Sequence, residues 1–450
     1  MHKIERLLQT LAPKGVGFRK LGDIGEFYGG LVGKSKKSFS QGNKFYVPYI
    51  NVFNNPQLDL NALEGVQIGD KEKQNTIQLG DVLFTGSSEN LEDCAMSCVV
   101  TQKIEEDIYL NSFCFGFRFF DKNLFNPSFL KHFLRDYNFR KNISKVANGV
   151  TRFNVSKQLL SQITIPIPPL EIQQEIVKIL DAFTELNTEL NAELNARKKQ
   201  YEYYQNMLLD FNDINQSHKD AKEKLTQKPY PKRLKTLLQT LAPKGVEFRK
   251  LGDIGEYIRG VTYKKNQEIN NLECGIKVLR ANNITLSNHL NFEDIKVINK
   301  NVKIRKEQYL KKNDILICAG SGSSEHIGKV AFINTDFDYV FGGFMGVIRI
   351  REINSRFVYH IFTSNIFKQY LEKSLNTTTI NNLNANILQN FLIPIPPLEI
   401  QQEIVKILDQ FSLLTTDLLA GIPAEIKARK KQYEYYREKL LTFKPLTPNK

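Results

Sequence analysis

The chain has 450 residues, which is enough for two or more domains of ordinary size, each with its own core. Its 62 lysine and arginine residues exceed its 48 aspartate and glutamate residues, and the net charge of +14 favours a polyanionic partner. Apolar runs stay shorter than eighteen residues and the opening run is too short for a signal peptide, which argues against a membrane span, so we expect a cytoplasmic protein.

The sequence contains the same half twice, with a pseudo-two-fold internal repeat as the expected architecture. Three pairs of segments agree almost letter for letter: Leu7–Glu26 with Leu237–Glu256, Ile165–Asp181 with Ile393–Asp409, and Ala196–Tyr204 with Ala428–Tyr436. Between these blocks the two halves diverge heavily. One scaffold therefore carries two different heads, a design typical of a binder of a two-part ligand.

Each half opens with a head of mixed α/β character, over residues 1–164 in the first half. Runs rich in β-branched and aromatic residues, such as Lys44–Phe53, predict short strands, whereas Phe129–Phe139 predicts a helix. His132 on that segment is matched by His360 in the second half. Both histidines lie among apolar residues, and we interpret them as packing residues rather than catalytic ones.

A long amphipathic helix follows the first head, within residues 165–211. Apolar residues recur at steps of three and four from Ile172 to Phe211. Pro166, Pro168 and Pro169 precede this stripe and form a stiff extended lead that sets where the helix begins.

The second half repeats this order after a polar, charged segment that we interpret as a linker. The stripe returns in the second half, although Gly421 and Pro423 should kink or interrupt that helix. We expect the two helices to pair antiparallel through their stripes; packing of each helix on its own head is the alternative. The predicted parts after the first helix are the linker 212–236, the second head 237–392, the second helix 393–443 and a tail 444–450.

Motifs for catalysis or metal binding are not found in the sequence. The five cysteines form no CxxC pair and have no metal-ligand spacing, so we assign them structural roles. Gly320–Lys329 (GSGSSEHIGK) comes nearest to a phosphate loop, but its glycine spacing is one residue too long and Val330 replaces the required Ser or Thr.

The residues resemble those of the specificity subunit of type I restriction-modification systems. Val150–Ile176 and Thr378–Ile404 look like the two junctions of that family, each leading through IPIPPLEIQQEI into a long helix. The resemblance implies two target recognition domains separated by two long antiparallel coiled-coil helices. It also implies a chain that is not an enzyme, binds no cofactor or metal, and recognises a bipartite double-stranded DNA target. Catalysis, S-adenosylmethionine and ATP with Mg²⁺ would belong to separate modification (methyltransferase) and restriction (translocase and nuclease) subunits.

DNA contacts are expected from basic residues that neutralise phosphates and from polar loop residues that read base edges. The candidate phosphate contacts are Lys34, Lys36, Lys37, Lys264 and Lys265. The candidate base readers are Ser87, Ser88, Asn90, Asn148, Thr151, Arg152 and Asn154 in the first head, and Ser321, Ser323, Ser324, His326, Thr377, Thr379, Asn381 and Asn382 in the second. Two alternatives stay open: the lysines form a solvated face, and Asn154 and Asn382 only cap the helices that follow.

Two other functions remain possible at this point. The chain could be a two-headed protein-interaction scaffold without DNA specificity, with the helices recruiting two protein ligands. It could also be a single-chain nuclease or methyltransferase whose motif is not recognisable.

Overall fold

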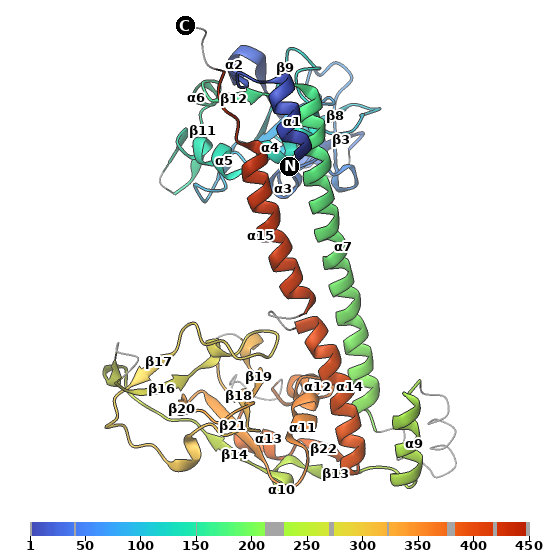
Figure 1. Cartoon of the computed structure of the whole chain (residues 1–450), viewed down its shortest axis with the longest axis vertical. Helices are drawn as coiled ribbons and strands as arrows, with labels where there is room; N and C mark the ends of the chain where they lie inside the picture. The colour runs from blue at the N-terminus through green and yellow to red at the C-terminus, as the bar shows by residue number, and fades with distance from the viewer. Residues whose placement is uncertain are drawn as a thin grey trace. The chain divides into compact units, whose positions relative to one another are not determined.

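The computed structural model describes residues 2–39, 42–149, 151–211, 229–269, 274–321, 324–375, 383–416 and 421–446. They form two compact units, each described by itself below (Figure 1). Unit 1 comprises Met1–Leu190 and Ile426–Lys450, and unit 2 comprises Asn191–Glu425. The units do not follow the two halves of the sequence, because each contains one head together with the ends of both long helical segments.

Unit 1 has the predicted mixed α/β head. Its elements are α1 (His2–Leu11), β1 (Gly17–Lys20), α2 (Leu21–Ile24), β2 (Gly25–Gly29), β3 (Lys44–Val47), α3 (Tyr49–Asn54), β4 (Glu64–Val66), β5 (Val82–Thr85), β6 (Ser87–Ser88), β7 (Ser97–Val99), β8 (Ile108–Leu110), β9 (Cys114–Phe119), α4 (Pro127–Phe133), α5 (Tyr137–Ser144), β10 (Ala147–Asn148), β11 (Phe153–Val155), α6 (Lys157–Leu160), β12 (Thr164–Ile167), the first part of α7 (Leu170–Leu209) and the main part of α15 (Ile422–Leu441).

The core of the first head lies on both faces of an antiparallel sheet with strand order β2-β9-β5-β7. Side chains alternate along β5: Val82 and Phe84 pack with α4, α5 and the start of α7, whereas Leu83 packs toward β3 and β8. The second layer is the sheet β4-β3-β8, in which β3 and β8 run parallel. The head therefore has helices on one side of its main sheet and a small sheet on the other.

Unit 2 repeats this arrangement with different residues. Its elements are the end of α7, α9 (Lys232–Leu241), β13 (Glu247–Lys250), α10 (Leu251–Ile254), β14 (Gly255–Arg259), β15 (Glu268–Ile269), β16 (Ile276–Leu279), β17 (Lys296–Ile298), β18 (Ile315–Cys318), β19 (Val330–Phe332), β20 (Tyr339–Phe341), β21 (Met345–Ile350), α11 (Ser355–Phe362), α12 (Asn365–Leu375), α13 (Ala385–Gln389), β22 (Leu392–Ile395), α14 (Leu398–Thr416) and the start of α15 (Ile422–Leu441). The sheet order β14-β21-β18-β19 matches that of the first head, and β16 pairs parallel with β20 as β3 does with β8.

A buried ion pair recurs at matching positions of the two main sheets. Arg118 binds Asp81 through two hydrogen bonds of 2.9 and 2.6 Å, and Arg349 binds Asp314 through two of 2.8 Å. Both aspartates are buried. Because a buried carboxylate needs a charged partner, this pair fixes β9 and β21 to the turns before β5 and β18 in heads that otherwise diverge.

Part of the predicted strand Lys44–Phe53 is helical instead. Strand β3 ends at Val47, and α3 begins at Tyr49 after Pro48, whose backbone is extended with φ −70°. Proline has no N–H to continue a ladder, so the strand ends there despite the β-branched residues that follow. Tyr49 then stacks on Phe53 along the short helix, with ring centroids 5.9 Å apart.

The helical segments follow the prediction with two differences. The second segment is two helices, α14 and α15, and the break falls near Gly421 as expected, with residues 417–420 outside the described ranges. The expected linker lies outside those ranges from 212 to 228, and its end is helical because α9 begins at Lys232. No helix in the described part of the chain is long and apolar enough to cross a membrane.

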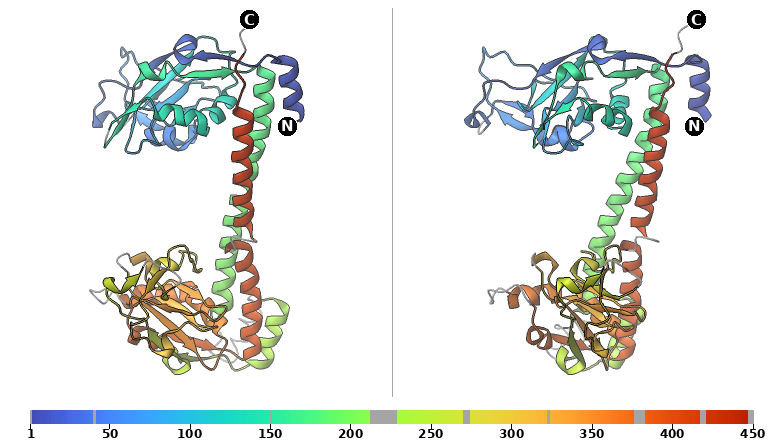
Figure 2. Two further views of the ribbon diagram at one scale, coloured as in Figure 1. Left: turned by 60° about the vertical axis from the view of Figure 1, so that its left-hand side comes forward. Right: turned by 90° about the vertical axis from the view of Figure 1, so that its left-hand side faces the viewer.

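The long helices run antiparallel in each unit, and they exchange ends between the two copies of the repeat. In unit 1, α7 leaves the first head and α15 arrives there, and the two helices run side by side (Figure 2). Phe183 of α7 stacks on Tyr436 of α15. In unit 2, α14 leaves the second head and α7 arrives there, so that Tyr204 stacks on Phe411. Each head is thus covered by the end of the helical segment that started from the other copy.

The start of each long helix is fixed to its head by a buried glutamine of the repeated segment LEIQQEI. Gln173 accepts a hydrogen bond from the N–H of Asn126 (2.8 Å) and donates to the carbonyl of Pro168 (2.8 Å). Gln401 makes the same two bonds with Asn354 (2.9 Å) and Pro396 (2.7 Å). These bonds join the proline-rich lead, the helix start and the beginning of α4 or α11.

The two matching histidines lie where each head packs on the start of its long helix. His132 and His360 are buried, and each Nε2 lies within 2.7 or 2.9 Å of a carboxylate oxygen of Asp181 or Asp409. Burial lowers the pKa of both imidazoles and outweighs the carboxylates, which would raise it. Nδ1 of His360 is buried without a hydrogen-bond partner, as suits a neutral ring.

These histidines should make folding stability fall in acid. An imidazole with a lowered pKa binds fewer protons folded than unfolded, so its contribution is complete above the ordinary value of 6.5 and is lost as the pH falls below it. Thermal unfolding followed by circular dichroism should show a lower Tm at about pH 5.5 than at about pH 7.5. The double variant H132Q/H360Q should flatten this dependence, and H326Q should keep it. A wild-type Tm that is constant over this range would contradict the assignment.

A half chain of residues 1–211 should form a homodimer. The first head lacks its cover in this fragment, but Tyr201, Tyr204 and Leu208 of a second copy match Tyr433, Tyr436 and Leu440, which pack on the first head in the whole chain. Sedimentation equilibrium should give a dimer, and L208D should reduce it to monomers. A soluble monomer with full helix content would contradict the exchange of helix ends.

Candidate nucleic-acid interface

The polar residues predicted as readers in the first head lie together. Asn148 pairs with Asn154 across β10 and β11, and Asn154 pairs with Ser87 across β11 and β6. The guanidinium of Arg152 donates from Nε to the hydroxyl of Ser87 (3.2 Å). Ser88 and Asn90 follow on the same loop, joined by a 3.2 Å bond from the Asn90 N–H to the Ser88 hydroxyl. We call the group Ser87, Ser88, Asn90, Asn148, Thr151, Arg152 and Asn154 the first polar surface.

This surface is held in place by partly buried residues that the sequence did not single out. The Tyr49 hydroxyl donates to the carbonyl of Ser87 (2.9 Å). Arg140 of α5 donates to the carbonyls of Glu92, Cys94 and Ala95, which fixes the loop after Asn90. An arginine on a polar helix looks exposed in the sequence, and no pattern there reveals that it binds backbone carbonyls.

The helix-capping alternative for Asn154 is wrong. The cap of α6 is Ser156, whose side chain accepts a hydrogen bond from the N–H of Leu159. Asn154 is instead an exposed strand residue. In the second head, Asn384 caps α13, whereas Thr377, Thr379, Asn381 and Asn382 lie outside the described residues.

The candidate phosphate contacts of the first head differ from one another. Lys34 is paired with Glu72 (2.5 Å) and donates to the carbonyl of Gln67, and its side chain is only 9 % exposed. The hydrogen bond from Lys34 lowers the pKa of Glu72 to about 2. Lys36 and Lys37 are exposed on a short 3-10 helix (Lys36–Phe39). Lys34 is therefore engaged within the protein, whereas Lys36 and Lys37 face solvent.

The second head brings several predicted residues to the rim of a hollow of about 950 Å³. Lys265, Ser321 and His326 line it together with Arg259 and Arg280, which the sequence did not single out. Lys264 directly precedes Lys265 in the chain, and Ser324 lies two residues before His326. Ser323 lies outside the described residues. The second head thus presents a concave, partly cationic surface where the first has a small polar sheet.

In the segment Gly320–Lys329, which comes nearest to a phosphate loop in sequence, the lysine binds backbone carbonyls of the protein. Lys329 is buried and donates from Nζ to the carbonyls of Ala281 (3.1 Å) and Ile284 (2.5 Å). Burial lowers the pKa of this ammonium. The lysine that a phosphate loop would aim at its ligand is therefore used to join two segments of the head.

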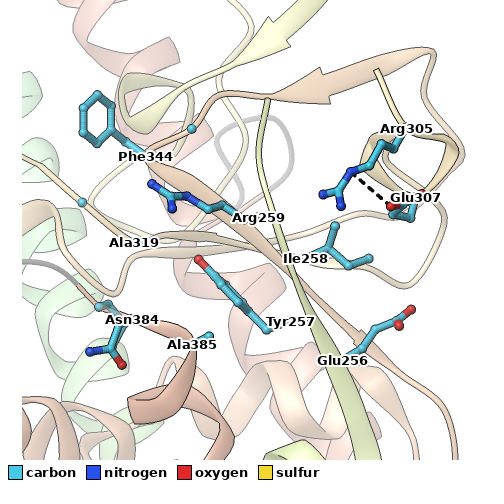
Figure 3. Close-up of a pocket in the computed structure, with 13 residues that line it drawn as sticks. Glu256, Tyr257, Ile258, Arg259, Arg305, Glu307, Ala319, Phe344, Asn384 and Ala385 are labelled. Carbon is cyan, nitrogen blue, oxygen red and sulfur yellow. Dashed lines mark ion pairs between the residues drawn. The ribbon is translucent and has the colours of Figure 1, made fainter. Parts of the chain in front are cut away.

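A smaller hollow of about 570 Å³ adjoins the first and shares part of its lining (Figure 3). Arg305 is paired with Glu307 (3.2 Å) in this hollow. Arg259 and Phe344 line both hollows, and Figure 3 shows them on the same side. These shared residues place the two hollows next to each other in the second head.

The chemistry available on these surfaces is hydrogen bonding and charge pairing. Hydroxyl, amide and guanidinium groups are exposed, and these groups bind phosphates and base edges. Burial raises the pKa of Cys98 and Cys114 to about 12, which keeps both as thiols. Within the described ranges, no three His, Cys, Asp or Glu side chains are grouped so as to hold a metal ion.

Comparison with known proteins defines the class. Residues 13–197 and 243–428 both match the family described as Type I restriction modification DNA specificity domain. The two matches cover most of the chain and coincide with the two copies of the repeat. The chain therefore belongs to this family, as the resemblance of its junctions predicted.

Individual relatives agree with this assignment. The chain is 34 % identical to a putative type I restriction enzyme specificity subunit of Haemophilus influenzae, over 72 % of this chain and 74 % of the relative. It is 32 % identical to the EcoR124I/EcoR124II specificity subunit of Escherichia coli, over 64 % of this chain and 65 % of the relative. A chain in the solved structure on complex assembly and conformational transition of the type I R-M system shares the fold, with a TM-score of 0.56, 17 % identity and coverage of 95 % and 97 %.

Proposed function

We propose that this chain is the specificity subunit of a type I restriction-modification system and recognises a bipartite double-stranded DNA target. The observation that carries the proposal is the double match to the DNA specificity family, with two heads that share a fold but present different surfaces. Each head reads one half-site. The long helices connect the two heads, so that the two half-sites are recognised together as one bipartite target.

The chain acts with partners rather than alone. Modification subunits carrying S-adenosylmethionine, and restriction subunits carrying ATP and Mg²⁺, perform the chemistry in the cytoplasm, and this chain supplies specificity without being an enzyme itself. Membership of the specificity family supports this division of labour. The protein-interaction scaffold gains no support from the relatives, which are specificity subunits.

The function is tested by selecting bound duplexes from a random DNA library with the purified chain and its modification subunits. A target of two defined half-sites separated by unread base pairs is the expected result. Binding without any sequence preference would overturn the proposal. Mapping methylated positions in the source genome gives an independent reading of the same target.

Variants of the first polar surface should change only the first half-site. N154A and R152A each remove a side chain that can bind a base edge, at a cost of about 1–3 kcal/mol for the correct base. Repeating the library selection should show relaxed preference at one or two positions of one half-site, with the other half-site unchanged. N123A, in an exposed turn of the same head, is the control. Altered preference in both half-sites would show that the heads do not read independently.

Replacing the exposed Lys36 and replacing the paired Lys34 should have different effects on how DNA affinity depends on salt. K36A removes an exposed charge and should lower the slope of log affinity against log salt by about one. K34A should leave that slope close to wild type and lower the Tm, because this lysine is paired with Glu72. Fluorescence anisotropy over a salt series measures the slope. Equal slopes for K36A and wild type would remove Lys36 from the interface.

A further inference from the structure

Phe113 and Phe344 occupy matching turns in the two heads. Each is the last residue of a three-residue turn, which joins β8 to β9 in the first head and β20 to β21 in the second. Phe113 is 62 % exposed and Phe344 is 72 % exposed. Aromatic side chains of this size are usually buried to a large extent, so exposure repeated at the same turn of both heads requires an explanation.

The repetition distinguishes this pair from other exposed aromatic residues of the heads. Phe120 and Tyr137 are exposed to similar degrees, at 66 % and 68 %. The matching positions of the second head hold Arg351 and Asn365, as the register of the strands and helices shows. Within the exposed parts of two divergent heads, the phenylalanine of this turn is retained where these other aromatic residues are replaced.

Both turns are rigidly attached to the loops that carry the candidate readers. The carbonyl of Phe113 accepts a hydrogen bond from the N–H of Gly86 (2.8 Å), the residue before Ser87. The carbonyl of Phe344 accepts two, from the N–H groups of Ala319 (2.9 Å) and Gly320 (3.0 Å). Gly320 likewise directly precedes Ser321. Each ring is therefore held beside the reading surface of its head.

The surroundings of the second ring suit a polyanion. Phe344 lines the two hollows together with Arg259, and Lys265 and Arg280 line the larger one. In the first head, Arg152 is bonded to Ser87, one residue from the glycine that holds Phe113. An apolar ring beside cationic and polar groups is the arrangement by which proteins approach stacked bases between two phosphate backbones.

We propose that Phe113 and Phe344 are wedges that each insert between adjacent base pairs of one half-site and kink the DNA there. This rests on the proposed function. Because the two heads present different polar surfaces and read different bases, a residue that they share serves a feature common to both half-sites. Stacked base pairs are such a feature, and partial unstacking by an apolar side chain bends the duplex so that it meets more of the protein surface.

The test compares F113A, F344A and the double variant with wild type, in complexes of the full chain with its modification subunits. The selected target duplex carries a donor and an acceptor dye at its ends, so that energy transfer reports bending and anisotropy reports affinity. Each single variant should bend the duplex less and bind on the order of tenfold more weakly, with base preferences unchanged. F113L should keep part of the bend, and F120A should behave as wild type.

Three outcomes would overturn the wedge. The alanine variants could bend and bind the duplex as wild type does. The alanine variants could lose affinity only for duplexes that carry thymine in the target and bind as wild type does when uracil replaces it. That result would show that the ring contacts the thymine methyl group instead. They could also lose the modification subunits while the bend persists, which would assign the rings to a protein contact. Failure of the wild type to prefer any sequence would instead overturn the proposed function, since the wedge test starts from a selected target.

Discussion

The structure depends first on the buried glutamine at the start of each long helix. Gln173 and Gln401 are 0 % and 2 % exposed, and each accepts a hydrogen bond from a backbone N–H and donates one to a buried proline carbonyl. Leaving such groups without partners costs about 1–3 kcal/mol each. The amide therefore fixes the direction in which a helix leaves its head. Because the segments around it are identical in the two copies, both helices leave their heads in the same way.

Because the helix ends are exchanged, the core of each head includes residues from the other copy of the repeat. His132 of the first head lies against Tyr433 of the second copy, with Nδ1 and the hydroxyl oxygen 3.2 Å apart. In the second head, Gln205 of the first copy donates to the carbonyl of His360 (3.0 Å). Neither head has a complete core without the other copy, which explains why the blocks at the helix ends are repeated letter for letter while the surfaces of the heads are free to differ.

The sequence predicted the repeat, the long helices and the mixed heads because these follow from periodicity and duplication. It did not predict where β3 ends, since the alternating pattern of Lys44–Phe53 hides the effect of Pro48. In the site, the first polar surface came together as residues from separate loops, yet Tyr49 and Arg140 were missed. Their roles depend on which carbonyls lie within reach, and that is set by tertiary packing rather than by any local pattern.

The count of 62 lysine and arginine residues overstates what the heads can offer to DNA. Arg118 and Arg349 neutralise buried aspartates, and Arg135 donates to the carbonyls of Ser97, Val52, Phe53 and Asn55. Burial lowers the pKa of Arg135 to about 10, and its guanidinium is engaged with these backbone carbonyls. Lys34 and Lys329 are likewise engaged inside the heads. Specificity must therefore come from a few exposed groups placed by this internal framework, so two heads with one fold can read different sequences by changing short loops.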